Sequence, residues 1–216
     1  FRSPLLARII VATQNTMLVA AGAVLISATV GSALGLVAGY AGPRTSQVIM
    51  RLADVIMSFP SLLIAVIVLY ILGPSVVNLI IVLAITRIPV YLRTTRAEVL
   101  EVRERMFVQA ARVMGASDRR IIFRHILPVV LPTLLTIATL DFAFVMLAES
   151  ALSFLGLGFP PDFPTWGRLL YDAVDQMQMY PWRVILPGAF ISLTVLSVNY
   201  IGDGLRDAMD PRIRGR

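Results

Sequence analysis

The stretch FVQAARVMGASDRRIIFRHILP, Phe107 to Pro128, decides how the rest of the chain is interpreted. It carries four Arg residues and lies between two long apolar runs. A polar segment with helical periodicity between apolar runs predicts a folded element on the surface of a membrane protein, where a partner can grip it. The alternative is a solvated loop that only joins two membrane spans.

Two short helices are predicted around this stretch. Apolar residues recur at three- and four-residue intervals from Glu98 to Met114, which predicts one amphipathic helix with a stripe facing the membrane domain. The stripe consists of Val99, Val102, Met106, Ala110 and Val113. Gly115 is suited to a left-handed C-cap, and Ser117 to the N-cap of a second helix that runs into Pro128. Asp118 would lie at the positive end of that second helix.

Composition indicates a membrane protein. The chain has 216 residues, of which 57% are hydrophobic and 15% charged, and its mean hydropathy is +0.81. It contains no Cys, one His and no Lys, which excludes a disulfide framework, multi-histidine metal sites and a Walker A nucleotide site. No nucleophile with a neighbouring base and no metal-ligand spacing occurs, so we expect no enzymatic activity and no cofactor. Phe1 is not a start methionine, and we expect the chain to begin inside a longer protein.

Hydropathy predicts an all-α, polytopic bundle with five spans in a single domain, residues 1–216. A span needs about 20 apolar residues. The candidates are Asn15–Tyr40, Phe59–Leu72, Ser75–Tyr91, Pro128–Glu149 and Val184–Ile201. The second candidate, Phe59–Leu72, is short for a span, and an earlier start within Val48–Met57 is the alternative. We expect one further span before Phe1.

The arginines predict the orientation, because positively charged loops stay on the cytoplasmic side. Fifteen of the 19 Arg residues lie in segments 41–58, 87–127 and 202–216, which five spans place on one side. This side, with the C-terminus, is predicted to be cytoplasmic, and Phe1 is predicted to be outside. The tail, with Arg206, Arg212, Arg214 and Arg216, fits anionic lipid better than nucleic acid.

Polar side chains inside the spans are candidates for a translocation path, because an acid near the bilayer centre costs about 2.5 to 3.5 kcal/mol on insertion scales. Asp141 lies deepest, and a structural hydrogen bond to a neighbouring helix explains it at least as well as substrate contact. For Glu149 a structural role is favoured. Asn78 and Asn199, near the ends of their spans, are weaker candidates.

Small residues and aromatics suggest packing roles. Ser27, Gly31, Gly35 and Gly39 form a smooth ridge at four-residue spacing, for packing inside this chain or against a second one. The segment 159–182 is rich in Pro, Asp and aromatics. Trp166 and Trp182 are suited to the membrane-water interface.

A motif in the central stretch resembles a known family. Gln109, Ala110, Ala111, Gly115, Leu127 and Pro128 have the spacing of the EAA loop of permease subunits of bacterial ATP-binding-cassette importers. Gln109 replaces the usual Glu, whereas His125 is typical of the dipeptide, oligopeptide and nickel branch. Further matches to the second-position permeases of that branch are Gly39-Tyr40, Met50-Arg51, Asp54, Phe59-Pro60, Pro89, Tyr91, Arg93, Arg96, Glu149–Gly158, Pro164–Gly167 and Gly202–Arg212.

This resemblance implies a permease that forms half of a translocation path for a di- or oligopeptide or a related solute in the bacterial inner membrane. A loop at about 93–128 would couple it to cytoplasmic ATPases. The coupling residues implied are Gln109, Ala110, Ala111, Gly115, Ala116, Ser117, Asp118, Arg119 and Arg120. Arg119 and Arg120 are equally well explained as solvated or lipid-facing charges.

Partners follow from the same resemblance. They would be a homologous permease, two ATPases that bind ATP and Mg, and an extracytoplasmic substrate-binding protein. The binding protein would dock on the 159–182 surface, where Asp162, Asp172 and Asp175 offer charge. Two other classes stay open: a secondary transporter or channel driven by an ion gradient, which favours inverted repeats and coupled intramembrane charges, and a receptor or scaffold without transport.

Overall fold

The computed structural model describes residues 5–160 and 162–209, and all regular secondary structure within them is helical. The elements are α1 Leu5–Tyr40, α2 Pro43–Met57, α3 Ser61–Leu72, α4 Val76–Val102, α5 Met106–Val113, α6 Asp118–Arg120, the π-helical η1 Ile121–Ile126, α7 Leu127–Phe154, α8 Trp166–Val174 and α9 Trp182–Met209. The all-α class expected from composition is confirmed.

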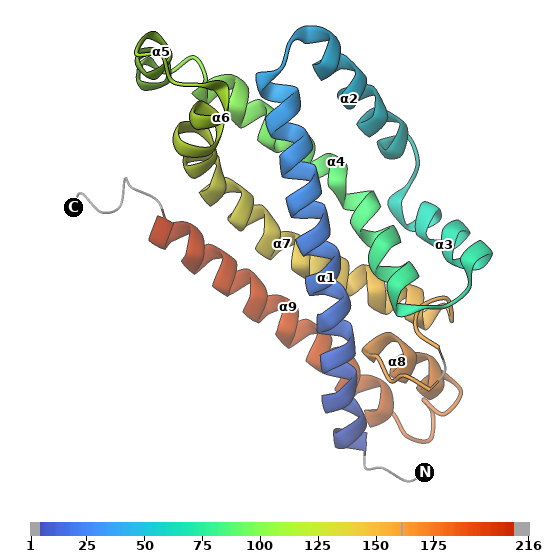
Figure 1. Ribbon diagram of the computed structural model, residues 1–216. Helices are drawn as coiled ribbons and strands as arrows, with labels where there is room; N and C mark the ends of the chain where they lie inside the picture. Colours follow the sequence, from blue (N-terminus) through green and yellow to red (C-terminus); the bar gives the residue numbers. More distant parts are fainter. Residues whose placement is uncertain (1–4, 161, 210–216) are drawn as a thin grey trace.

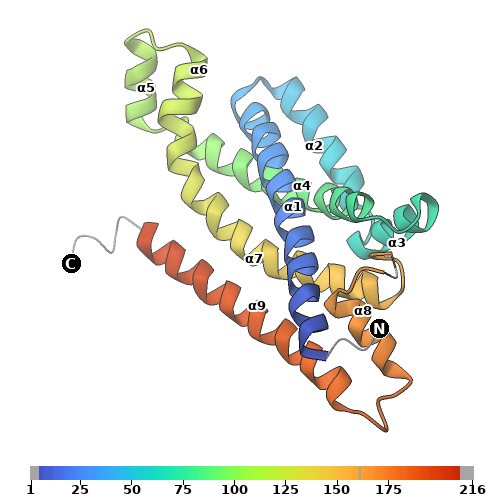
Figure 2. The same ribbon diagram turned by 60° about the horizontal axis from the view of Figure 1, so that its bottom comes forward.

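The long helices form a tilted bundle around α1 and α7. α1 lies along α4 and crosses α7, while α9 covers another side of α7 (Figure 1). The turn between α1 and α2 lies at the same end of the bundle as α5 and α6, and α8 lies at the other end (Figure 2). Segment 41–58 and the later part of segment 87–127, which the arginine distribution assigned to one side, therefore lie at the same end of the bundle (Figure 2).

Within residues 5–160 and 162–209, four helical runs are long and apolar enough to cross a membrane: Leu5–Tyr40, Val76–Val102, Asp118–Phe154 and Trp182–Ala208. The pair α2 and α3 passes the same test only when taken together, and the two helices meet at an angle of 79°. Five spans are reached when this pair counts as one. The bend is located at Ser58–Pro60, since Pro60 has no N–H with which to continue α2 and precedes α3.

The first and third spans are longer than hydropathy predicted. The first span was predicted to begin near Asn15, but α1 begins by Leu5 and includes Arg8 and Asn15. Both polar side chains have partners: Arg8 pairs with Asp172 at 3.3 Å, and Asn15 donates to the Pro164 carbonyl at 2.8 Å. α4 likewise continues past Pro89 to Val102.

The small-residue ridge of α1 packs inside this chain, against α4. A Cβ built on Gly35 would lie 2.5 Å from the Thr95 Cβ and 2.7 Å from the Leu92 carbonyl oxygen. Gly31 and Gly39 approach α4 as closely. The intramolecular interpretation of the ridge is confirmed, because α4 would have to move away if these positions carried side chains.

Two apolar clusters fill the bundle. One lies toward the end that holds α8 and includes Trp166, which is fully buried. The Trp166 ring packs in the core and so does not face lipid or water as an anchor, whereas Trp182 is half exposed. The other cluster lies beneath α5 and α6 and contains Leu36, Tyr91, Val99, Val102, Val108, Ile121, Ile126, Val130 and Leu134.

Candidate functional site

The connection between α4 and α7 contains a break that the sequence pattern missed. A single helix from Glu98 to Met114 was predicted, but α4 ends at Val102 and α5 begins at Met106. The physical reason is burial: Val108 and Ala111 are covered by the second cluster, whereas the expected stripe residues Met106 and Val113 point outward, exposed by 85% and 88%. The helix axis has to turn to bury this different face.

Side chains on both sides of the break hold it in place. The Arg103 guanidinium donates to the Gly39 carbonyl at 3.0 Å, which ties the end of α4 to the end of α1. The Gln109 amide donates to the Glu104 carbonyl at 3.1 Å. A carboxylate at position 109 could not donate this bond, so the replacement of the usual Glu has a local structural use.

Gly115 ends α5 as predicted. Its φ is +81°, a left-handed conformation that strains residues with a Cβ. The Ala116 N–H donates to the Ala111 carbonyl, and the Gly115 N–H donates to the Arg112 carbonyl, each at 3.0 Å. These two bonds define a Schellman motif, which fixes the direction in which the chain leaves α5.

The start of the next helix is fixed by α1 instead of by a cap. Ser117 occupies the N-cap position, but its side chain makes no capping bond. The Tyr40 hydroxyl donates to the Asp118 carboxylate at 2.6 Å, and Arg112 donates to the same hydroxyl at 3.3 Å. The hydrogen bond with Tyr40 raises the pKa of Arg112 above its ordinary value, so the guanidinium stays charged.

A π-helical turn joins this region to α7. Residues Ile121–Ile126 form η1, and helical structure continues without a gap from Asp118 to Phe154. Pro128 was predicted to open a new span, but it lies in the first turn of a helix that is already under way. Because Pro128 lacks an N–H and its ring crowds the preceding turn, the wider π turn provides the space it requires.

We call residues 106–120 the α5–α6 tip. Of the nine predicted coupling residues, Ala111 is buried and Ala116 is half-buried. The other seven are exposed: Gln109, Ala110, Gly115, Ser117, Asp118, Arg119 and Arg120. Apolar Met106, Val113 and Met114 lie beside them, exposed by 79% or more. The tip thus presents apolar side chains on an element braced by α1 and α4.

A cavity of about 490 Å³ adjoins the tip. Its walls come from the α1–α2 turn, the end of α4 and α5. Three arginines line it, Arg96, Arg103 and Arg112, with Glu104 as the acidic neighbour. Arg96 donates to the Ser46 hydroxyl at 2.8 Å, so the cavity wall also connects α4 to α2.

Among the path candidates, Asp141 forms an ion pair within the bundle. Its carboxylate is 1% exposed and accepts from Arg87 on α4 at 2.5 Å. The prediction assigned Arg87 to the loop, whereas the structure places it well inside the α4 span. A signal was present: one Arg and one Asp, each in an otherwise apolar span, are candidates to neutralise each other.

The remaining path candidates fall in three different places. Glu149 is fully buried and accepts from Ser153 at 2.6 Å, which supports the structural role favoured for it. Asn78 donates to the Leu72 and Gly73 carbonyls and so closes the α3–α4 turn. Asn199 is half-buried on α9. Across residues 5–160 and 162–209, no three His, Asp or Glu side chains gather where they could hold a metal ion.

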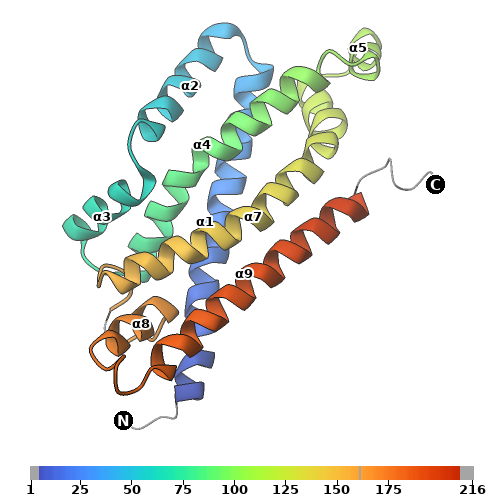
Figure 3. The same ribbon diagram turned by 180° about the vertical axis from the view of Figure 1, so that it is seen from behind.

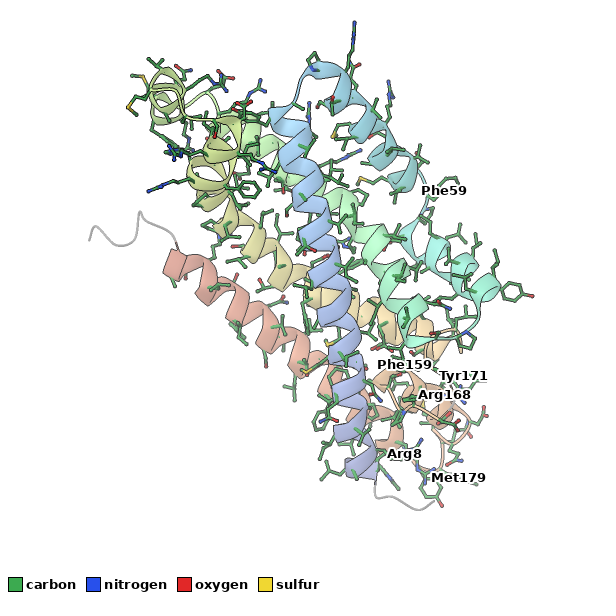
Figure 4. All side chains as sticks on the ribbon, viewed as in Figure 1. Arg8, Phe59, Phe159, Arg168, Tyr171 and Met179 are labelled. Carbon is green, nitrogen blue, oxygen red and sulfur yellow. The ribbon has the colours of Figure 1, made fainter. Side chains whose placement is uncertain are left out.

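The opposite end of the bundle carries its own charge cluster. Asp172 on α8 pairs with Arg8 at 3.3 Å and with Arg168 at 3.1 Å, and Arg168 lies over the Tyr171 ring (Figure 4). Asp172 therefore links α8 to α1 and is not a free charge. Asp162 and Asp175 are exposed. The predicted tail arginines Arg212, Arg214 and Arg216 lie outside the described residues.

Fold and tip together define a polytopic membrane protein with an exposed two-helix tip at one end. The model of the family described as binding-protein-dependent transport system inner membrane component matches residues 31–215. The chain belongs to this family, whose members are multi-pass transport components of membranes.

Curated relatives cover most of the chain. It is 45% identical over 184 residues to a dipeptide transport system permease, DppC, of Alkalihalophilus pseudofirmus, which covers 85% of this chain and 60% of that protein. It is 43% identical over 210 residues to the di/tripeptide permease DppC of Pseudomonas aeruginosa, covering 97% and 69%. Identity to the glutathione permease GsiD of Pectobacterium atrosepticum is 37%, covering 96% and 69%. The chain thus spans 60 to 69% of these relatives' lengths.

Solved structures share the fold. An inward-facing structure of the MetNI methionine ABC transporter superposes with a TM-score of 0.77 at 15% identity, covering 97% of this chain and 100% of that chain. An amino acid ABC transporter structure superposes with a TM-score of 0.73 at 16% identity, covering 94% of each chain. The helical architecture is therefore that of ABC transporter membrane subunits.

Proposed function

We propose that this chain is the permease subunit of a binding-protein-dependent ABC importer and forms half of a translocation path for di- or oligopeptides or a related solute. The observation that carries the proposal is the α5–α6 tip, with exposed Val113 and Met114 on a braced helix. Apolar side chains exposed on such an element are suited to a groove in a partner protein. Dipeptide, di/tripeptide and glutathione permeases among the relatives support a peptide-like solute.

The tip would be the coupling element. Its centre would be Ala110, Ala111, Gly115, Ala116, Ser117 and Asp118, with Gln109, Arg119 and Arg120 at its margin. Tyr40, Arg103 and the Schellman turn fix the tip to α1 and α4, so a force applied there is passed to the bundle instead of being absorbed by a flexible loop. This favours the coupling interpretation over a plain connecting loop.

The assembly would consist of residues 1–216 as one permease domain, a homologous second permease, two ATPases and an extracytoplasmic binding protein. ATP and Mg would be bound by the ATPases, and this chain would hold no cofactor. The tip and the C-terminus would face the cytoplasm from the inner membrane, as the arginine distribution favours. Asp141, Glu149 and Asn199 would lie along or support the path. No nucleic acid is involved.

The test uses the full-length protein reconstituted with its ATPases, second permease and binding protein. Met114→Asp places a charge on the apolar tip surface. We expect ATP-driven peptide uptake to fall at least tenfold, because burying an unpaired carboxylate in the contact costs several kcal/mol. Met114→Leu is the matched control, since it keeps an apolar side chain of similar size at the same position, which is 79% exposed.

The control should leave ATPase coupling intact. Cross-links from position 114 to an ATPase subunit would support the proposal. Wild-type uptake that persists in Met114→Asp, or a tip that labels from outside intact cells, would overturn it.

A further inference from the structure

The ion pair between α4 and α7 has unused hydrogen-bonding capacity on both partners. The Arg87 Nε donates to one Asp141 oxygen, Oδ1, and Nη2 forms the ion-pair contact with the same oxygen. The other oxygen, Oδ2, is buried and has no hydrogen-bond partner among the described residues. A structural pair would use both oxygens in a bidentate contact, which is the stronger arrangement. Among the described residues, this pair leaves the Asp141 Oδ2 acceptor and the Arg87 Nη1 donor without a hydrogen-bond partner.

A second donor lies near the Asp141 carboxylate. The Tyr91 hydroxyl is buried one turn along α4 from Arg87 and interacts with Asp141 and Ser27, although it makes no hydrogen bond of normal geometry among the described residues. Asp141 therefore has a neutral donor available if Arg87 turns away. An anion within a span needs such compensation, because an unpaired charge there is costly.

The two charges differ in their access to the surroundings. The Asp141 side chain is 1% exposed, whereas that of Arg87 is 20% exposed. Arg87 lies over the ring of Phe144, 4.3 Å from the centroid, and Phe144 is 42% exposed. α4 and α7 run side by side on the face of the bundle that lies away from α1 (Figure 3). The Arg87 guanidinium is thus partly accessible where it lies over Phe144, whereas its counter-ion Asp141 is buried.

From this geometry we propose that Arg87 binds the carboxylate of the transported solute, with Asp141 as its resting counter-ion and Phe144 as the surface over which the ligand passes. The inference rests on the proposed function and narrows the solute to one that bears a carboxylate. Arg87 turns its fork to the incoming carboxylate, and the Tyr91 hydroxyl then donates to Asp141. A planar guanidinium suits bidentate recognition of a carboxylate. The alternative partner is an acidic side chain of a second permease. Such a contact would need an arginine at the surface, whereas Arg87 is largely buried.

The experiment compares a peptide with a free C-terminal carboxylate and the same peptide as its C-terminal amide. Uptake into proteoliposomes is measured for the full-length assembly at saturating loaded binding protein, with wild type and with the double variant Arg87→Gln/Asp141→Asn. The double variant removes both charges together and leaves polar amides in their place, so neither charge is left unpaired. Because the binding protein is the same in both assemblies, its own preference cancels in the ratio of acid to amide uptake.

We expect the acid-to-amide ratio to fall about tenfold or more in the double variant, as for loss of a charge-assisted hydrogen bond. The control is Arg93→Gln/Asp54→Asn, which neutralises a 2.6 Å pair between α4 and α2 and should leave the ratio unchanged. Basal ATPase activity confirms assembly in each case.

An unchanged ratio in the double variant, with both peptides still taken up, would overturn the role of Arg87 while leaving the permease function in place. Loss of the second permease from the purified double variant would overturn it in favour of an interface charge. Absence of uptake of either peptide by the wild type, with ATPase coupling retained, would instead overturn the peptide-like substrate.

Discussion

The α1–α4 contact and the α5–α6 tip use apolar surface in opposite ways. Along α1, glycines bring the backbone so close to α4 that a Cβ at Gly35 would meet Thr95 at 2.5 Å. At the tip, Val113 and Met114 point away from the chain. The first region has no spare room and determines stability. The second has its apolar surface unburied and contributes little to folding, so its side chains are free to serve a contact with another molecule.

If buried helix contacts determine stability and the tip does not, the largest loss of stability is expected from a change inside the bundle. Asp141→Ala leaves Arg87 without its counter-ion, which should lower the stability of the folded protein by about 3 to 5 kcal/mol. Thermal unfolding in detergent measures it. Asp54→Ala is the control, because the Asp54 pair with Arg93 is 42% and 43% exposed and should matter by less than about 1 kcal/mol. Equal losses in the two variants would contradict the assignment.

An intermediate effect is expected at the close helix contact. Gly35→Ala forces α4 away from α1 and should cost about 1 to 3 kcal/mol. Gly22→Ala is matched in helix and in chemistry, but its new methyl would meet only the flexible end of Ile80 at 3.3 Å. If the unfolding temperature falls no more in Gly35→Ala than in Gly22→Ala, α4 can move away from α1 at little cost in stability.

The smallest effect is expected where the tip is tied to α1. Tyr40→Phe removes the hydroxyl that donates to Asp118 and should cost about 1 kcal/mol or less, since the bond is exposed. We expect the change to appear mainly as faster amide hydrogen exchange in residues 115–120, with α4 unaffected. Exchange that increases equally throughout the bundle would mean that the tip and the core unfold together.

Sequence reasoning located the helices more successfully than it located their ends. Apolar runs predicted the long helices, because a helix that crosses lipid needs a continuous run of apolar residues and such a run is visible in the sequence. Arg8 was left outside the first predicted span, which began at Asn15, and Arg87 was counted with the cytoplasmic segment 87–127. All three side chains find a partner on a distant segment. Such partners depend on tertiary contacts between segments more than 50 residues apart, which periodicity does not contain.

The tip was predicted in kind but not in detail. The prediction of a left-handed C-cap at Gly115 was correct, because this conformation depends only on the residue itself and its neighbours in the chain. The break at 103–105 was missed, since Val99, Val102, Met106, Ala110 and Val113 form a regular stripe that the fold does not use as one face. Tyr40 was missed as the tether of the tip, because no local pattern links it to Asp118, 78 residues away.

The unbroken helical run from Asp118 to Phe154 makes this part of the chain a lever. Between Asp118 and Glu149 it extends about 47 Å at 1.5 Å per residue. One arm ends in the tip, and the other ends in the buried glutamate beside α8. If the helix is rigid and pivots at the ion pair of Asp141, a small displacement of the tip moves the Glu149 end in the opposite direction. The π turn at Ile121–Ile126 is where such a lever would flex first, because its hydrogen-bonding pattern differs from that of the α-helix on either side.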